Sequence, residues 1–243
     1  MSYNKQWLSF FALLLLFALL LPMLCQGLTA PLTASVTATV LETVIIVDAG
    51  HGGIDGGATG VDGVQEKDLN LKIARQLAVY LRLLGATVVE TREKDVSLAS
   101  PDAVHGHVKQ SDLENRVRLA EGYSDAIFIS IHMNTFPEAS CRGLQVWYSE
   151  NHQGSKTLAN GVQRAVKEGL QQDNNRKIKA ATNGIYVLRH LSCPAILIEC
   201  GFLSNAAECQ ALESEQMQKK LAIVMANAII NFKKMPNGTC AMP

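Results

Sequence analysis

Short apolar runs alternate with amphipathic stretches between about residue 42 and residue 235. The runs 43–48 (TVIIVD) and 126–131 (AIFISI) are apolar at successive positions, as expected for strands that are buried on both faces. Between the runs, apolar residues recur every three or four positions, which predicts helices packed against a sheet. The alternation predicts an α/β fold: a single domain with a mostly parallel, twisted open sheet of about six strands and helices on both faces.

The same pattern locates the other elements. Further strands are predicted at residues 87–91, 144–148, 185–188 and 195–198. Helices are predicted at 69–84, where Gly85 ends the helix, and around 113–120, capped by Ser111 or Asp112. Two more helices are predicted at 158–166 and 221–232, the second opened by the capping pair Asn205 and Glu208.

An uninterrupted apolar run precedes the domain. Residues 7–24 (WLSFFALLLLFALLLPML) follow Lys5 and have the length of a signal-peptide core or a short membrane anchor. We therefore expect an exported, extracytoplasmic protein. An uncleaved anchor is favoured over a removed signal, because bulky Leu24 precedes Cys25 and Pro31 follows the cleavage-like triplet 28–30. This divides the chain into a signal or membrane anchor (1–25), a linker (26–41), a folded domain (42–235) and a tail (236–243).

Charge and composition exclude several classes of function. Lys plus Arg and Asp plus Glu both number 22, so the chain lacks the basic excess typical of nucleic-acid-binding proteins. The glycine-rich run 50–57 lacks both the lysine of the GxxxxGK[ST] motif and the GxGxxG order, which argues against nucleotide binding. The six cysteines permit disulfides in an exported chain, but their pairing is not determined by the sequence. Cys193 and Cys200 flank an apolar strand and are predicted to be buried thiols.

Two histidines and two glutamates fall where predicted elements meet. His51 follows the first strand, Glu66 opens the first helix, His132 ends the third strand and Glu199 ends the last. Because the carboxyl ends of parallel strands share one rim, we expect these side chains to lie together. Two imidazoles and one carboxylate suit zinc and leave one coordination position open. We therefore predict one Zn²⁺ held by His51, Glu66 and His132.

The fourth side chain has a different expected role. Glu199 follows four apolar residues, so we expect partial burial to raise its pKa. We interpret it as the catalytic general base that accepts a proton from water and passes it to the leaving group. The alternative is a structural acid paired with a base such as Arg189. Backbone N–H groups of the glycine-rich loop are candidates for stabilising the oxyanion.

The motifs around these residues resemble a known family. VDAGHGGIDGGATG, QEKDLNL, ISIHMN and PAILIECGFLSN resemble the zinc-dependent N-acetylmuramoyl-L-alanine amidases of the Amidase_3 type over about residues 44–232. In that family the metal ligands correspond to His51, Glu66 and His132, and the catalytic glutamate corresponds to Glu199. The segment NRKIKAATNGIYVLRH and the polar stretch 97–111 are similar to the spore-cortex, germination-specific group.

The resemblance implies hydrolysis of the amide between N-acetylmuramic acid and L-alanine in spore-cortex peptidoglycan. A deacetylase would then complete muramic-δ-lactam. Two alternatives stay open: a non-catalytic peptidoglycan-binding protein on the same fold, and a zinc hydrolase of another cell-wall amide. The presence of all four residues argues against the first. The expected partners are peptidoglycan and, through the N-terminal segment, a membrane; the sequence does not identify a protein partner.

Overall fold

The structure is a computed structural model that describes residues 41–104 and 106–234. The predicted signal or anchor (1–25), the linker as far as residue 40 and the tail (236–243) lie outside these residues, as do Cys25 and Cys240. Among the helices that the structure describes, none is long and apolar enough to cross a membrane.

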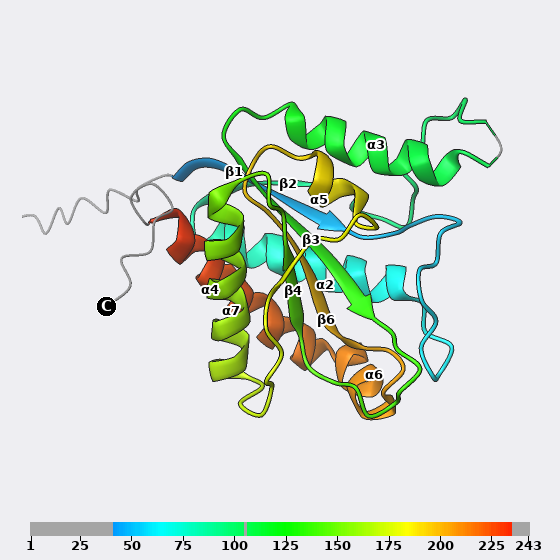
Figure 1. The fold of residues 1–243 in the computed structure, drawn as a ribbon, viewed down its shortest axis with the longest axis vertical. Coiled ribbons are helices and arrows are strands. Elements are labelled where there is room, and N and C mark those ends of the chain that lie inside the picture. Colours follow the sequence, from blue (N-terminus) through cyan, green and yellow to red (C-terminus); the bar gives the residue numbers. More distant parts are fainter. Residues whose placement is uncertain (1–40, 105, 235–243) are drawn as a thin grey trace, which may run out of the picture. The chain divides into compact units, whose positions relative to one another are not determined.

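A six-stranded sheet forms the centre of the domain, in the order β2-β1-β3-β6-β4-β5 (Figure 1). The four strands β2, β1, β3 and β6 run parallel to one another. The strand β4 pairs antiparallel with β6 and parallel with the short β5. The bounds are β1 (Leu41–Ala49), β2 (Ala86–Glu90), β3 (Ala126–Asn134), β4 (Gln145–Tyr148), β5 (Lys179–Ala180) and β6 (Ala195–Phe202).

Helices cover both faces of this sheet, as the sequence pattern predicted (Figure 1). One face packs against α2 (Glu66–Leu83), α4 (Gln153–Gly169) and α7 (Glu215–Lys233), with α6 (Ala206–Glu213) beside α7. The other face packs against α3 (Val108–Glu121) and α5 (Tyr186–His190). Successive strand residues such as Ile45 and Ile46 belong to the two different cores, because side chains alternate across a sheet.

Some element predictions were wrong. The predicted strand 185–188 is the helix α5, whose Val187 and Leu188 are buried against the sheet. A short apolar run fits a buried strand and a buried helix equally well, so its pattern does not distinguish them. The sixth strand is instead the two-residue β5, which is too short to show any periodicity.

The helix ends also differ in part from the predictions. The helix α3 begins at Val108, and neither Ser111 nor Asp112 caps it; the carboxylate of Asp112 instead accepts a hydrogen bond from Arg116. Asn205 does cap a helix, because its side chain accepts a hydrogen bond from the Glu208 N–H. That helix is the separate α6, and Ser214 caps α7 one residue after α6 ends.

The pleat of the sheet gathers polar side chains on the α3/α5 face. Asp48 of β1, Ser130 and His132 of β3, and Glu199 of β6 all line one cavity on this side. Cys200, next in sequence to Glu199, points to the opposite core and is 1% exposed. All four cysteines within the described residues are free thiols. Cys200 is buried, as predicted, whereas Cys193, which was also predicted to be buried, is only half-buried.

Candidate metal centre

The carboxylate of Glu66 lies between the imidazoles of His51 and His132. Its Oε2 is 3.2 Å from Nε2 of His51, and its Oε1 is 3.0 Å from Nδ1 of His132. The two rings are 5.0 Å apart between centroids and meet edge to face. Three segments distant in sequence, namely the end of β1, the start of α2 and the end of β3, therefore converge at one point.

Two glycines make this convergence possible. A Cβ atom at Gly57 would lie 2.6 Å from Oε2 of Glu66 and 2.8 Å from Cδ2 of His51, and its φ of +66° is in the left-handed region. A Cβ at Gly50 would lie 2.2 Å from Nε2 of His132. Any larger residue at either position would displace a ring or the carboxylate.

His51 itself adopts a left-handed backbone conformation, with φ of +61°, which is costly for a residue that has a Cβ. The fully buried Arg116 holds this segment by donating to the carbonyl oxygens of Ala49 (2.9 Å) and His51 (2.8 Å). Arg92, also buried, donates to the carbonyl oxygens of Ala49 and Gly50. Guanidinium groups from two distant segments thus hold the backbone at and just before His51.

Asp48 completes the anchor of Arg116. Its Oδ1 lies 2.5 Å from Nη1 of Arg116, and its carboxylate also accepts hydrogen bonds from Thr91 and Ser130. Burial by itself would raise the pKa of Asp48. The charge of Arg116 and the two hydroxyl donors outweigh burial and hold that pKa below its usual value.

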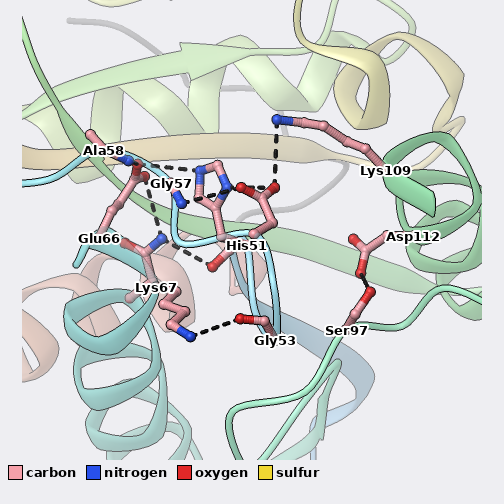
Figure 2. A network of polar contacts seen from close by, with 12 residues as sticks. His51, Gly53, Gly57, Ala58, Glu66, Lys67, Ser97, Lys109 and Asp112 are labelled. Carbon is pink, nitrogen blue, oxygen red and sulfur yellow. Dashed lines mark hydrogen bonds and ion pairs between the residues drawn. The ribbon is translucent and has the colours of Figure 1, made fainter. Parts of the chain in front are cut away.

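On its outer side His51 is held by Asp55, four residues further along the loop. Nδ1 of His51 is 2.9 Å from Oδ2 of Asp55, and Nζ of Lys109 is 3.5 Å from the same oxygen (Figure 2). With the proton on Nδ1, His51 presents the lone pair of Nε2 towards Glu66. Neither Asp55 nor Lys109 was predicted from the sequence; the i, i+4 spacing of His51 and Asp55 was the available signal.

Glu66 is bound on all sides. Besides the two imidazoles, its carboxylate accepts hydrogen bonds from the backbone N–H groups of Ala58 (2.9 Å) and Met133 (3.0 Å). Burial would raise the pKa of Glu66, but its contacts with His132 and His51 lower that pKa far below the usual value. Glu66 is therefore a carboxylate at neutral pH, which is the form that binds cations.

Glu199 lies beside this group without a partner. It is opposite His132 in the register of the parallel strands β3 and β6. Its Oε2 is buried and has no hydrogen-bond partner, and no ion pair joins it to Arg189, the alternative considered from the sequence. Burial, reinforced by the negative charge of Glu66, raises the pKa of Glu199 to about 8. A carboxyl group in this state can both accept and donate a proton near neutral pH.

A cavity of about 260 Å³ opens over Glu199 and the two histidines. It lies between the sheet and the helices α3 and α5, and side chains such as Lys109 and Tyr186 line it. In the glycine-rich loop, the backbone N–H groups of Gly52, Gly53, Gly57 and Ala58 already donate to protein acceptors. These four amides are therefore already hydrogen-bonded within the protein, and the role of the loop in stabilising an oxyanion stays a prediction.

The donor set fits a metal ion. One ligand atom from each of His51, Glu66 and His132 lies within 4.8 Å of the other two, and two imidazole nitrogens with one carboxylate oxygen form a donor set found in catalytic zinc sites. The buried, unpartnered oxygen of Glu199 lines the same cavity. The structure therefore brings together all four residues that the sequence singled out.

The chain is similar to known proteins over most of its length. The family model described as N-acetylmuramoyl-L-alanine amidase (Amidase_3) matches residues 45–231. The germination-specific N-acetylmuramoyl-L-alanine amidase of Bacillus subtilis (strain 168) is 36% identical over 191 residues, which cover 78% of this chain and 79% of the relative.

Solved structures show the same relationship. The CwlD amidase from Clostridioides difficile, in complex with the GerS lipoprotein, superposes with a TM-score of 0.74 at 37% identity, covering 78% of this chain and 97% of that chain. The N-acetylmuramoyl-L-alanine amidase AmiC2 of Nostoc punctiforme superposes with a TM-score of 0.67 at 31% identity, covering 78% of this chain and 96% of that chain.

Proposed function

This chain belongs to the Amidase_3 family of N-acetylmuramoyl-L-alanine amidases, and from that membership we propose that it is a zinc-dependent enzyme acting on spore-cortex peptidoglycan. The family activity is hydrolysis of the amide between N-acetylmuramic acid and L-alanine. The observation that carries the zinc proposal is the position of Glu66 between His51 and His132, with the unpartnered Glu199 lining the same cavity.

In this proposal His51, Glu66 and His132 hold the ion. Zinc supplies Lewis acidity, which polarises the amide carbonyl and makes water more acidic. Asp55 keeps the proton of His51 on Nδ1 and so leaves Nε2 free to bind. Arg116 and Arg92 hold the backbone that carries His51, so the ligand is in place before substrate arrives.

Glu199 acts as the proton carrier of the reaction. In its ionised form it accepts a proton from the attacking water, and in its protonated form it gives that proton to the alanine nitrogen as the amide breaks. Its burial next to Glu66 supports this role, because both raise the pKa of Glu199 above that of an exposed carboxyl group.

The spore-cortex assignment is supported by the two most informative relatives. The Bacillus subtilis relative is named for germination, and the CwlD structure is at a similar level of identity. We infer that the product is destined for muramic-δ-lactam formation. Because cell-wall amidases act outside the cytoplasm, we also infer that residues 1–25 export the chain or anchor it to a membrane. The CwlD relative forms a complex with a lipoprotein, and we propose that this chain also binds a partner of that kind.

Digestion of intact cortex sacculi by the full chain, followed by mass spectrometry of the muropeptides, tests the proposal. Loss of the whole peptide stem with free L-alanine at its amino end is the expected result, together with about one zinc per chain in the purified protein. Loss of acetyl groups would identify a deacetylase, and cuts within the stem would identify a peptidase. Binding to sacculi without any new product would identify the non-catalytic alternative.

A further inference from the structure

A second group of metal-type donors lies outside the site described above. Asp62, Cys209 and Glu213 each offer one ligand atom, and these atoms all lie within 4.8 Å of one another. Asp62 lies in the turn of the loop that joins β1 to α2. Cys209 and Glu213 are one helical turn apart on α6, so they present their side chains on the same side of that helix.

The thiol of Cys209 is fully buried, with 0% exposure, although the other two side chains are exposed. The loop is shaped to receive it: a Cβ at Gly60 would lie 2.7 Å from its Sγ. The turn at Gly60 is closed by two backbone hydrogen bonds, from Gly60 to Val64 and from Gly63 to Gly60. The sulfur therefore sits at a fixed place against the loop, with Asp62 and Glu213 on its outer side.

The charges around this sulfur are unbalanced. Neither Asp62 nor Glu213 forms an ion pair with any Lys, Arg or His that the structure describes. Burial and the charges of Glu213 and Asp62 raise the pKa of Cys209, so its side chain is a neutral thiol until a cation binds. Two carboxylates therefore face this thiol with no positive charge among the described residues to balance them.

The chemistry of the donors selects the class of cation. Mg²⁺ and Ca²⁺ take oxygen ligands, whereas a thiolate with carboxylates suits a borderline-soft divalent ion such as Zn²⁺ or Co²⁺. Ligand atoms around a tetrahedral zinc lie about 3.5 Å apart, so donors within 4.8 Å of one another need only small side-chain movements to close on an ion.

We propose that Asp62, Cys209 and Glu213 form a second divalent-cation site, distinct from the His51 cluster and built around a thiolate. Binding transfers the thiol proton of Cys209 to solvent as the metal–sulfur bond forms. The bound ion links the loop between β1 and α2 to α6. That loop continues into Glu66, whose backbone N–H donates to the carbonyl oxygen of Ala58. The link therefore restricts the motion of the segment that carries Glu66.

Sulfur makes the two sites separable by spectroscopy, because the His51 cluster contains no thiolate. The experiment is a titration of the reduced, metal-free full chain with Co²⁺, followed by the thiolate-to-cobalt charge-transfer band in the near ultraviolet. We expect the band to saturate at one equivalent in a His51→Ala variant, where the first cluster has lost a ligand. Cys209→Ser should abolish the band, whereas Cys141→Ser and Cys193→Ser should leave it unchanged.

The exposed carboxylates provide variants that keep the fold. Asp62→Asn and Glu213→Gln should each weaken the Co²⁺ affinity reported by the band about tenfold or more, with unchanged thermal unfolding of the metal-free protein. The proposal is overturned if the wild-type chain shows no band, if the band persists in Cys209→Ser, or if the double variant Asp62→Asn, Glu213→Gln binds as tightly as the wild type. These outcomes are independent of muropeptide digestion, so either proposal can fail without the other.

Discussion

The ring of His132 lies directly against the backbone of Gly50, so that a Cβ atom at position 50 would be 2.2 Å from Nε2. The His132 ring therefore lies closer to the backbone that follows β1 than any side chain at position 50 would permit. Gly50 brings no chemical group to the site. It nevertheless determines where one of the two histidines lies, and its substitution is the most direct test of the geometry.

Gly50→Ala should displace the His132 ring, because the added methyl group and the ring cannot occupy the same space. We expect hydrolysis of sacculi to fall about 100-fold or more, the effect of moving a reacting group by about 1 Å. Overpacking should cost about 1–3 kcal/mol of folding free energy. Gly161→Ala is the matched control, since nothing lies within 4 Å of a Cβ there and alanine favours helix α4. Equal activity of the two variants would contradict the arrangement of His132.

Asp55→Ala should loosen His51 while leaving all three proposed metal ligands in the chain. Loss of the 2.9 Å contact frees Nδ1 and allows the ring to rotate or to change tautomer. We expect zinc affinity, measured by competition with a chelator, to fall about 10–100-fold. Asp102→Ala, at an exposed loop position, serves as the control. Unchanged affinity in Asp55→Ala would show that the histidine is held by Glu66 and the backbone alone.

Glu199→Gln should separate metal binding from turnover. The amide keeps the size of the side chain but cannot accept a proton, so we expect turnover to fall by about 10²–10⁴ while the zinc content stays at the wild-type value. Metal analysis and muropeptide release on the same preparation check both halves of the prediction. Wild-type turnover in this variant would remove Glu199 from the mechanism, and loss of zinc would make it a ligand instead.

Asp48 should make folding stability depend on acid pH. Its pKa in the folded chain lies below the unfolded value of about 3.9, so the unfolded chain takes up the proton first as pH falls. The stabilisation is therefore complete above about pH 5 and is lost as pH falls through the folded pKa. Urea unfolding of the wild type at pH 7 and at pH 3 measures this loss.

Asp48→Asn should flatten that acid dependence and reduce stability at pH 7 by about 3 kcal/mol, because the buried Arg116 then keeps only one of its two anionic partners, Asp112. Asp125→Asn changes an exposed carboxylate and should leave the profile as it is. Parallel pH profiles for the wild type and Asp48→Asn would show that the ion pair with Arg116 does not control acid stability.

Local patterns in the chain were enough to predict the class of fold and to single out four residues that the structure brings together. Runs that are apolar at successive positions marked β1, β3 and β6, and the position of a polar residue at each strand end placed His51, His132 and Glu199 on one rim. This worked because parallel strands share a direction, so their ends coincide wherever the crossovers are regular. Side chains alternate along a strand, and Cys200 accordingly lies on the opposite face from Glu199.

Other features depend on contacts between segments that are far apart in the chain, and no local pattern encodes them. The residue Ile185 begins a run that could be strand or helix, and packing on the sheet makes it the helix α5. The hydrogen bond from Arg116 to the carbonyl oxygen of His51 joins residues 65 positions apart. The close contact between His132 and Gly50 forms only when β1 pairs with β3. The periodicity of apolar residues shows which face of a segment packs against the core. The contacts of an individual side chain depend instead on how the whole chain folds in three dimensions.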